Sequence, residues 1–153
     1  MGADFRGSEL GGPCSSISER EQVLGSKETG DLSRLDYHRF RGRVFDRDVV
    51  ITYLCNDGSL TLGDYHFSLH LFDDAVSDFD AAYTWLSATY GVPFVEYPSN
   101  QRDWGDKQFP RAGDEPKGYN ASWRGQEFHA SISLVAVGDR AGPNWHVFVV
   151  VTP

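Results

Sequence analysis

Large apolar and polar residues alternate along residues 37–67, a pattern that predicts three consecutive β-strands. The stretch is rich in β-branched and aromatic residues, and the sequence Asn-Asp-Gly at 56–58 interrupts it as a tight turn does. Side chains alternate across a pleated strand, so Phe67 is expected on one face and His66 on the other. Residues 37–67 therefore predict an antiparallel meander with one buried face and one wetter face.

The same pattern returns, less regularly, along residues 119–149. An aromatic residue is again followed by Arg and Gly, 83 residues after the first occurrence. Further along the two stretches, corresponding residues are 80 positions apart. The matched pairs are Phe40 with Trp123, Arg41 with Arg124, Gly42 with Gly125, Phe45 with Phe128, Val49 with Ile132, Ile51 with Leu134, Tyr65 with Trp145 and Phe67 with Val147. The chain is therefore interpreted as two repeats, residues 17–72 and 73–153.

Each repeat is expected to open with a helix. Ser18 and Glu21 have the spacing of a capping box, and Gly25 ends this first, short helix. The second helix is longer and begins at Asp73 or Asp74. Its apolar residues recur at spacings of three and four, as on one helix face: Val76, Phe79, Tyr83, Leu86 and Tyr90. This apolar stripe is expected to cover a sheet.

Together these elements predict an α+β protein. Two helix-plus-three-strand units are expected to form a mainly antiparallel sheet of about six strands, with the one long helix packed on a face. Residues 1–16 are rich in Gly and Ser and are expected to be a flexible leader that is tied down only at Cys14. Residues 17–153 then form a single domain, long enough to bury a real core.

Residues 95–118 contain three prolines and three glycines without lasting periodicity. This stretch is long for a plain connection and is typical of a binding loop or a disordered insert. Trp, Tyr and Arg dominate the binding energy of protein interfaces. Trp104 is therefore expected to contact a partner, and packing against its own domain is the alternative. The candidate binding residues of this loop are Arg102, Asp103, Trp104 and Phe109.

The formal net charge of −8 narrows the choice of partner. Affinity for nucleic acid comes mainly from Lys and Arg, and an anionic membrane surface repels an acidic chain. A basic protein, such as an enzyme or a toxin, is therefore the expected partner. No apolar run is long enough to cross a bilayer, and the first residues lack the features of a signal peptide, so any export signal is expected to have been removed.

Cys14 and Cys55 are the two cysteines of the chain. A bond between them closes a loop of 41 residues and, on the chain-entropy model, stabilises the fold by about 4 kcal/mol. We expect this disulfide, which places the protein in an oxidising compartment such as a bacterial periplasm, or outside the cell. Two inert buried thiols are the alternative.

The sequence contains no catalytic motif, phosphate-binding loop, dinucleotide fingerprint or paired CxxC, so no cofactor is expected. His66 and His70 lie on one face of a predicted strand but roughly 13 Å apart, too far to share a metal ion. A cluster of His66, His129 and His146 is the remaining metal or acid–base candidate, and ordinary surface histidines are the simpler interpretation. The acidic residues at 73–80 fit a helix N-terminus.

The predicted order is a short helix followed by three antiparallel strands, and this order occurs twice; the first helix ends in Val-Leu-Gly at 23–25. This arrangement resembles the β-lactamase-inhibitor-like and outer-membrane assembly lipoprotein (SmpA/OmlA) group of small exported bacterial proteins. The resemblance covers most of the chain. It implies a non-enzymatic periplasmic or secreted protein that holds another protein against an aromatic-rich sheet face or loops. No binding residue follows from it by motif.

The expected function is therefore that of an inhibitor or immunity protein, which neutralises an enzyme or toxin by direct docking. One alternative is a hydrolase of an envelope polymer that uses His and Asp residues on the sheet face. The other alternative is a structural component of the cell envelope.

Overall fold

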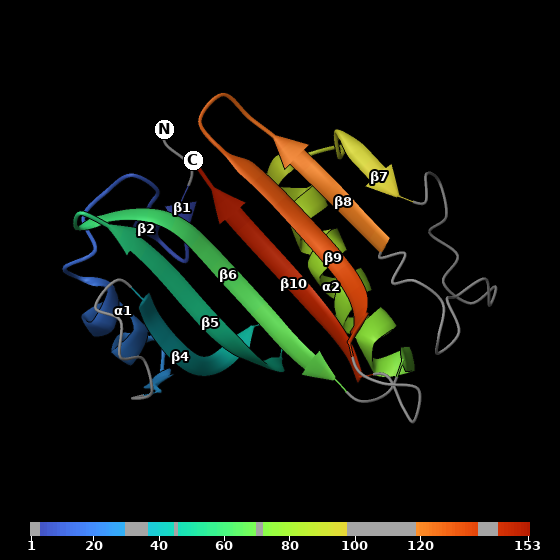
Figure 1. Cartoon of the computed structure of the whole chain (residues 1–153), viewed down its shortest axis with the longest axis horizontal. Helices are drawn as coiled ribbons and strands as arrows, with labels where there is room; N and C mark the ends of the chain where they lie inside the picture. Colours follow the sequence, from blue (N-terminus) through green and yellow to red (C-terminus); the bar gives the residue numbers. More distant parts are fainter. Residues whose placement is uncertain (1–3, 30–36, 45, 70–71, 98–118, 138–143) are drawn as a thin grey trace.

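The computed structural model describes residues 4–29, 37–44, 46–69, 72–97, 119–137 and 144–153 (Figure 1). Across these ranges the chain forms two helices, one two-stranded hairpin and one eight-stranded sheet in which every pairing is antiparallel. The α+β class and the antiparallel sheet predicted from the sequence are confirmed.

The sheet consists of two sets of four strands that lie side by side. The first set is β3 (Lys27–Glu28), β4 (Tyr37–Val44), β5 (Arg47–Asn56) and β6 (Ser59–Leu69). The second set is β7 (Val95–Tyr97), β8 (Tyr119–Arg124), β9 (His129–Val137) and β10 (Asn144–Thr152). The strand order β3-β4-β5-β6-β10-β9-β8-β7 brings the long strands β6 and β10 together at the centre and leaves the two short strands at the edges (Figure 1).

The predicted count of about six strands is two too low for the described residues. The missing strands are the edge strands, since β3 has two residues and β7 has three. Segments this short hold no alternation of polar and apolar residues that a pattern could detect. They are strands only because β4 and β8 pair with them.

At the centre of the sheet, β6 and β10 pair with Phe67 directly opposite Val147. These residues are the ones matched in the sequence at an offset of 80. The offset of 80 also relates the two flanking pairs to each other. His66 pairs with Phe148, and their counterparts, His146 and Ser68, pair with each other. The two halves of the sheet are therefore related by an approximate two-fold axis through the Phe67–Val147 pair.

The matched Arg-Gly sequences do not occupy equivalent places. Gly42 lies within β4, whereas Gly125 lies in the turn after β8, where its N–H donates to the carbonyl of Phe128. The turn between β4 and β5 has two residues and the turn between β8 and β9 has four, so the strand registers differ. The residue-by-residue match predicted for these strands is wrong, although Phe40 and Trp123 are both buried.

Helix α2 (Phe72–Tyr90) covers the second half of the sheet, as its apolar stripe predicted. It contacts β6, β8, β9 and β10. In Figure 1 it lies behind β8 and β9. Phe79 and Tyr83 are buried, and the centroid of the Tyr83 ring lies 5.5 Å from that of Trp123. Gly91, at φ +85°, ends the helix, and its carbonyl accepts a hydrogen bond from the Trp123 indole at 2.8 Å.

The N-terminal residues form small elements on the first half of the sheet. These are a hairpin of β1 (Asp4–Phe5) and β2 (Ser8–Glu9), and helix α1 (Ile17–Val23). Phe5 and Ile17 are buried, and α1 contacts β3 and β4. The segment at 4–16 therefore packs into the core, contrary to the prediction of a flexible leader tied down only at Cys14.

A disulfide joins Cys14 to Cys55, as predicted, with 6.4 Å between their Cα atoms. Backbone hydrogen bonds run beside it, from the N–H of Gly11 to the carbonyl of Leu60 and from the N–H of Cys14 to the carbonyl of Gly58. The N-terminal segment is thus held against the turn between β5 and β6 by one covalent bond and by main-chain pairing.

Candidate functional site

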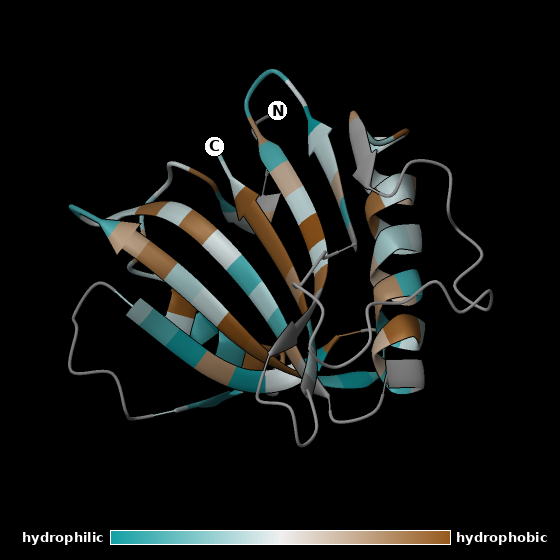
Figure 2. Cartoon of the chain, turned by 45° about the vertical axis from the view of Figure 1, so that its right-hand side comes forward, coloured by the Kyte–Doolittle hydropathy of each residue, from teal (hydrophilic) through white to brown (hydrophobic). Residues whose placement is uncertain are grey.

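The two faces of the sheet differ in what covers them. Helices α1 and α2 and the N-terminal hairpin lie on one face, and no helix or hairpin of the described chain crosses the other (Figure 1). Figure 2 shows hydrophobic and hydrophilic residues alternating along the long strands. We call the uncovered side the open face, and its side chains include Arg39, Arg41, Arg43, Val50, Thr52, Asp64, His66, Ser131, Ser133, His146, Phe148 and Val150.

One row of neighbouring residues crosses the open face from β3 to β8. Cross-strand pairing places the following residues side by side, in this order: Lys27, Arg41, Val50, His66, Phe148, Ser133 and Asn120. The row begins with two exposed cations, passes a half-buried apolar and aromatic centre, and ends in half-buried polar side chains. The open face is therefore cationic at its β4 edge and less polar in the middle.

Two histidines from the two halves of the sheet meet at the centre of the open face. His66 Nε2 and His146 Nδ1 lie 2.7 Å apart, with the rings at 22° and their centroids 5.0 Å apart, so the rings meet edge to edge in a hydrogen bond. The Phe148 ring stacks on His66 at 4.4 Å between centroids. Burial lowers the pKa of His66, and the charges of His146 and Arg39 lower it further, which favours the neutral ring.

Asp64 lies two residues before His66 in β6, on the same face. Its cross-strand neighbours are Thr52 in β5 and Val150 in β10. Its Oδ1 atom is buried and has no hydrogen-bond partner among the described residues. Burial raises the pKa of Asp64 to about 6, and Arg39 opposes this shift only in part. A carboxyl group with a raised pKa thus shares a face with the histidine pair, two residues before His66 along β6.

The predicted cluster of three histidines does not form. His129 lies opposite Thr152, six residues along β10 from His146, which is roughly 20 Å in an extended strand. His70 lies outside the described residues. In the part of the chain that the structure describes, no three His, Cys, Asp or Glu side chains gather closely enough to hold a metal ion. Of the histidines proposed from the sequence, the structure brings together His66 and His146.

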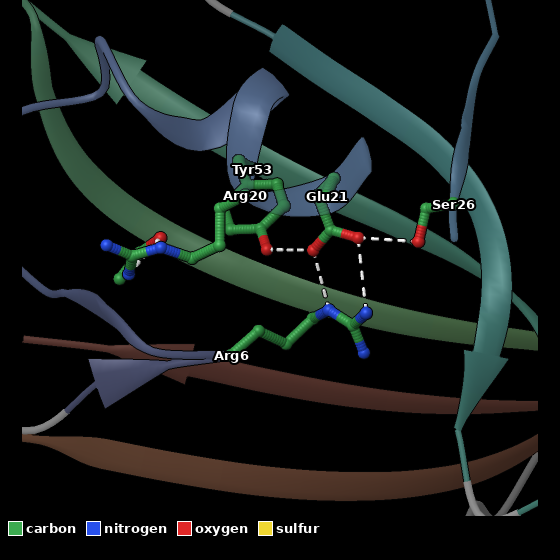
Figure 3. A network of polar contacts seen from close by, with 6 residues as sticks. Arg6, Arg20, Glu21, Ser26 and Tyr53 are labelled. Carbon is green, nitrogen blue, oxygen red and sulfur yellow. Dashed lines mark hydrogen bonds and ion pairs between the residues drawn. The ribbon is translucent and has the colours of Figure 1, made fainter. Parts of the chain in front are cut away.

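A second polar cluster lies on the covered side of the sheet (Figure 3). The carboxylate of Glu21 is fully buried and accepts hydrogen bonds from Arg6 at 2.6 and 3.1 Å, from the Ser26 hydroxyl at 2.6 Å and from the Tyr53 hydroxyl. These bonds join the β1–β2 turn, α1, the residue before β3, and β5. Both carboxylate oxygens of Glu21 are therefore satisfied, and the cluster holds the N-terminal elements in place.

The capping box predicted for the first helix is wrong. Helix α1 begins at Ile17, and its N-cap residue is Ser16, whose side chain makes no capping hydrogen bond. Glu21, expected to reach back to the helix start, is instead engaged by the buried cluster. Tertiary contacts therefore outweigh the local motif.

The remaining sequence candidates fall outside the open face. Arg102, Asp103, Trp104 and Phe109 lie outside the described residues. Of the acidic residues at 73–80, Asp78 is buried and accepts a hydrogen bond from Arg47, the first residue of β5. That carboxylate connects α2 to the first half of the sheet.

Comparison with known proteins adds no relative: no family model, no curated protein and no solved structure matches this chain. Neither helix of the described chain combines the length and the apolar character needed to cross a bilayer. The geometry of the open face is therefore the basis for the functional proposal.

Proposed function

We propose that this protein is a non-enzymatic binding module, an inhibitor or immunity protein that neutralises an enzyme or toxin by docking it on the open face. The observation that carries the proposal is the contrast between the two faces of one sheet. Helices and the N-terminal hairpin bury one face, while the other presents half-buried apolar side chains that no described element covers. Uncovered apolar surface with a polar rim is typical of protein interaction sites.

The residues of the open face suit a protein interface. Val50, Phe148 and Val150 give a half-buried apolar and aromatic centre, and the exposed Arg39 and Arg41 lie toward the rim. Interfaces place apolar and aromatic groups at the core and polar groups at the rim, and they are enriched in arginine. The net charge of −8 favoured a basic partner, whereas these arginines favour a partner that brings an acidic patch to this face.

The disulfide supports the location that goes with this function. A bond such as Cys14–Cys55 persists in oxidising compartments, so the proposal places the protein in the periplasm or outside the cell. The element order of a helix and its strands, given twice, supports the proposed likeness to the β-lactamase-inhibitor-like and outer-membrane assembly lipoprotein group. In that proposal each helix-plus-three-strand unit gains a short edge strand.

The proposal is tested by site-specific photo-crosslinking in cells that produce the protein. A p-benzoyl-phenylalanine residue is placed on the open face at Phe148 or at Arg39, and on control sites at Val23 or Val92, which are 82% and 90% exposed. We expect one protein to be captured from Phe148 and Arg39 and not from the controls.

The captured protein is then purified for a direct binding measurement. Phe148→Ala is expected to weaken its binding by about tenfold, as truncation of a central aromatic contact does. Capture from Val23 and Val92 alone, or unchanged binding by Phe148→Ala, would refute docking on the open face.

Residues 101–109, which lie outside the described residues, give a separate test of the same proposal. Arg102, Asp103, Trp104 and Phe109 are proposed to add contacts to the partner. Deletion of residues 101–109 is expected to weaken binding of the captured partner. Full binding after this deletion would remove the segment from the proposed interface and leave the open face as the docking site.

Hydrolysis of an envelope polymer is the second candidate function, favoured by one observation. Asp64, with its unpartnered oxygen, lies near the hydrogen-bonded His66 and His146 on a face that a substrate can reach. Release of soluble fragments from purified cell-wall polymer measures such an activity. An activity that survives Asp64→Asn combined with His66→Gln would remove this candidate, and an activity lost in that variant would favour it over the binding module.

A further inference from the structure

A pocket of about 510 Å³ opens at the β4 edge of the open face. Its walls include Lys27, Arg41, Arg43, Asp48, Val50 and His66. Lys27, Arg41, Val50 and His66 are consecutive members of the cross-strand row that leads to Phe148. The pocket is therefore the cationic beginning of the row whose apolar centre carries the proposed docking site.

The charges of the pocket are unbalanced. Three cationic side chains face one carboxylate, that of Asp48. Arg43 and Asp48 are 3.9 Å apart and both largely exposed, which makes a weak ion pair. Within the described residues, Lys27 and Arg41 form no ion pair. The pocket thus holds positive charge that the described chain does not neutralise.

This local charge is opposite in sign to the charge of the whole chain, which is −8. Salt screens exposed charges beyond roughly 8 Å at physiological ionic strength. A short anionic group inside the pocket therefore interacts with Lys27, Arg41 and Arg43, while a long polyanion also meets the acidic surface elsewhere. The contrast favours a few carboxylates on a partner protein over nucleic acid.

We propose that this pocket binds a short acidic segment of the partner protein, with its carboxylates on Arg41 and Arg43. The inference rests on the proposed function, because the segment belongs to the protein that docks on the open face. A guanidinium group pairs with a carboxylate through two parallel N–H···O bonds, so two arginines give both charge and direction to the contact. Val50, on the pocket wall, lies next to Arg41 in the row and suits the aliphatic part of a glutamate.

The proposal is tested on the full chain with a capped oligoglutamate peptide, titrated by isothermal calorimetry at low salt. A capped oligoglutamine peptide of equal length controls for main-chain binding. Two variants are compared: Arg41→Ser combined with Arg43→Ser, and the matched control Arg124→Ser. Arg124 is also exposed, but it lies in β8, five strands away in the sheet order. Thermal unfolding checks that these surface changes leave the fold intact.

We expect oligoglutamate to bind and oligoglutamine not to bind. The double variant is expected to lose about tenfold in affinity, as two exposed ion pairs allow, while Arg124→Ser keeps the affinity of the native chain. Added salt should weaken the binding. An equal loss in Arg124→Ser, or no binding of the peptide, would overturn the proposal. Displacement of the peptide by inorganic phosphate at similar concentration would also overturn it, because the pocket would then be a small-anion site only.

The two proposals fail separately. If a partner cross-links to Phe148 but oligoglutamate does not bind, the pocket assignment falls and docking on the open face stands. If oligoglutamate binds through Arg41 and Arg43 but no partner is captured, the pocket remains a peptide site and the proposed function falls.

Discussion

The ring of Phe5 lies against the backbone of Gly63 in β6, where a side chain at position 63 would otherwise be: a Cβ atom on Gly63 would come within 2.1 Å of the ring. Both residues are buried. We therefore expect Gly63→Ala to displace the β1–β2 hairpin and to lower the free energy of unfolding by about 1 to 3 kcal/mol through overpacking. Urea denaturation measures this loss.

A second substitution tests the cause of that loss. Phe5→Ala alone is expected to lower the free energy of unfolding by about 3 to 5 kcal/mol, because a buried ring is removed. Combined with Gly63→Ala, it also removes the ring that the new methyl group meets. The double variant is then expected to lose less than the sum of the two single losses. Strictly additive losses would mean that Gly63 matters for a reason other than Phe5.

Glu21 is expected to contribute strongly to stability, because its charged side chain is fully buried. Glu21→Gln removes the charge that Arg6 pairs with in the buried cluster, and breaking a buried ion pair costs about 3 to 5 kcal/mol in the free energy of unfolding. Glu19→Gln is the matched control, since Glu19 is exposed on the same helix and should change this value by less than about 0.5 kcal/mol. Equal effects of the two changes would contradict a structural role for the cluster.

The same residue predicts how stability responds to acid. Burial opposes ionisation of Glu21, but the hydrogen bonds from Arg6, Ser26 and Tyr53 outweigh it and hold the pKa below the ordinary value of 4.5. The stability that this group contributes is therefore present above that value and is lost as pH falls through the lower pKa of the folded state. Urea denaturation over an acidic pH series should show a steep loss in the native chain and a flatter one in Glu21→Gln.

The pKa of Asp64 is shifted upward, in the opposite direction to that of Glu21. Burial raises the pKa of Asp64 from 3.8 to about 6, so the stability contributed by its neutral form is present below the unfolded value and is lost as pH rises through 6. Asp64→Asn keeps the neutral form at every pH. Above pH 6 this variant is expected to be more stable than the native chain by about 1 to 2 kcal/mol, with no gain near pH 4. A gain that does not depend on pH would show that ionisation of Asp64 is not its cause.

The disulfide can be tested by counting thiols and by reduction. Denatured, non-reduced protein is expected to show no titratable thiol, because Cys14 and Cys55 are joined. Reduction should lower the free energy of unfolding by about 2 to 4 kcal/mol, since the bond closes a loop of 41 residues. Two thiols in the non-reduced sample would contradict the bond.

The sequence predicted those parts of the fold that depend on local pattern. Alternation located the six long strands, and spacings of three and four located the buried face of α2. The Asn-Asp-Gly turn follows from backbone preference, because Asp57 and Gly58 adopt φ values of 49° and 78° there. The strands β3 and β7 and the burial of Phe5 depend on contacts with distant residues, for which no local pattern exists.

The candidate site was predictable only in part. The offset of 80 made His146 the counterpart of His66, and antiparallel pairing about a two-fold axis brings such counterparts together. Asp64 was missed, although a carboxylate two residues before a histidine in a strand must share its face. The pocket could not be foreseen, because Lys27 joins Arg41 only through the two-residue strand β3.

The pairing between β6 and β10 has a consequence for how the two halves of the sheet are held together. Seven residue pairs join the two strands, and each half satisfies the main-chain groups that the other would leave bare. The first half on its own would expose the unpaired N–H and C=O groups of β6. An exposed edge strand of this kind readily pairs with a strand of another chain. A second copy of the same half, paired about the same axis, would place Phe67 opposite Phe67, where the chain instead has the smaller Val147. Joining both halves in one chain makes that association independent of protein concentration, so the face stays assembled at any dilution.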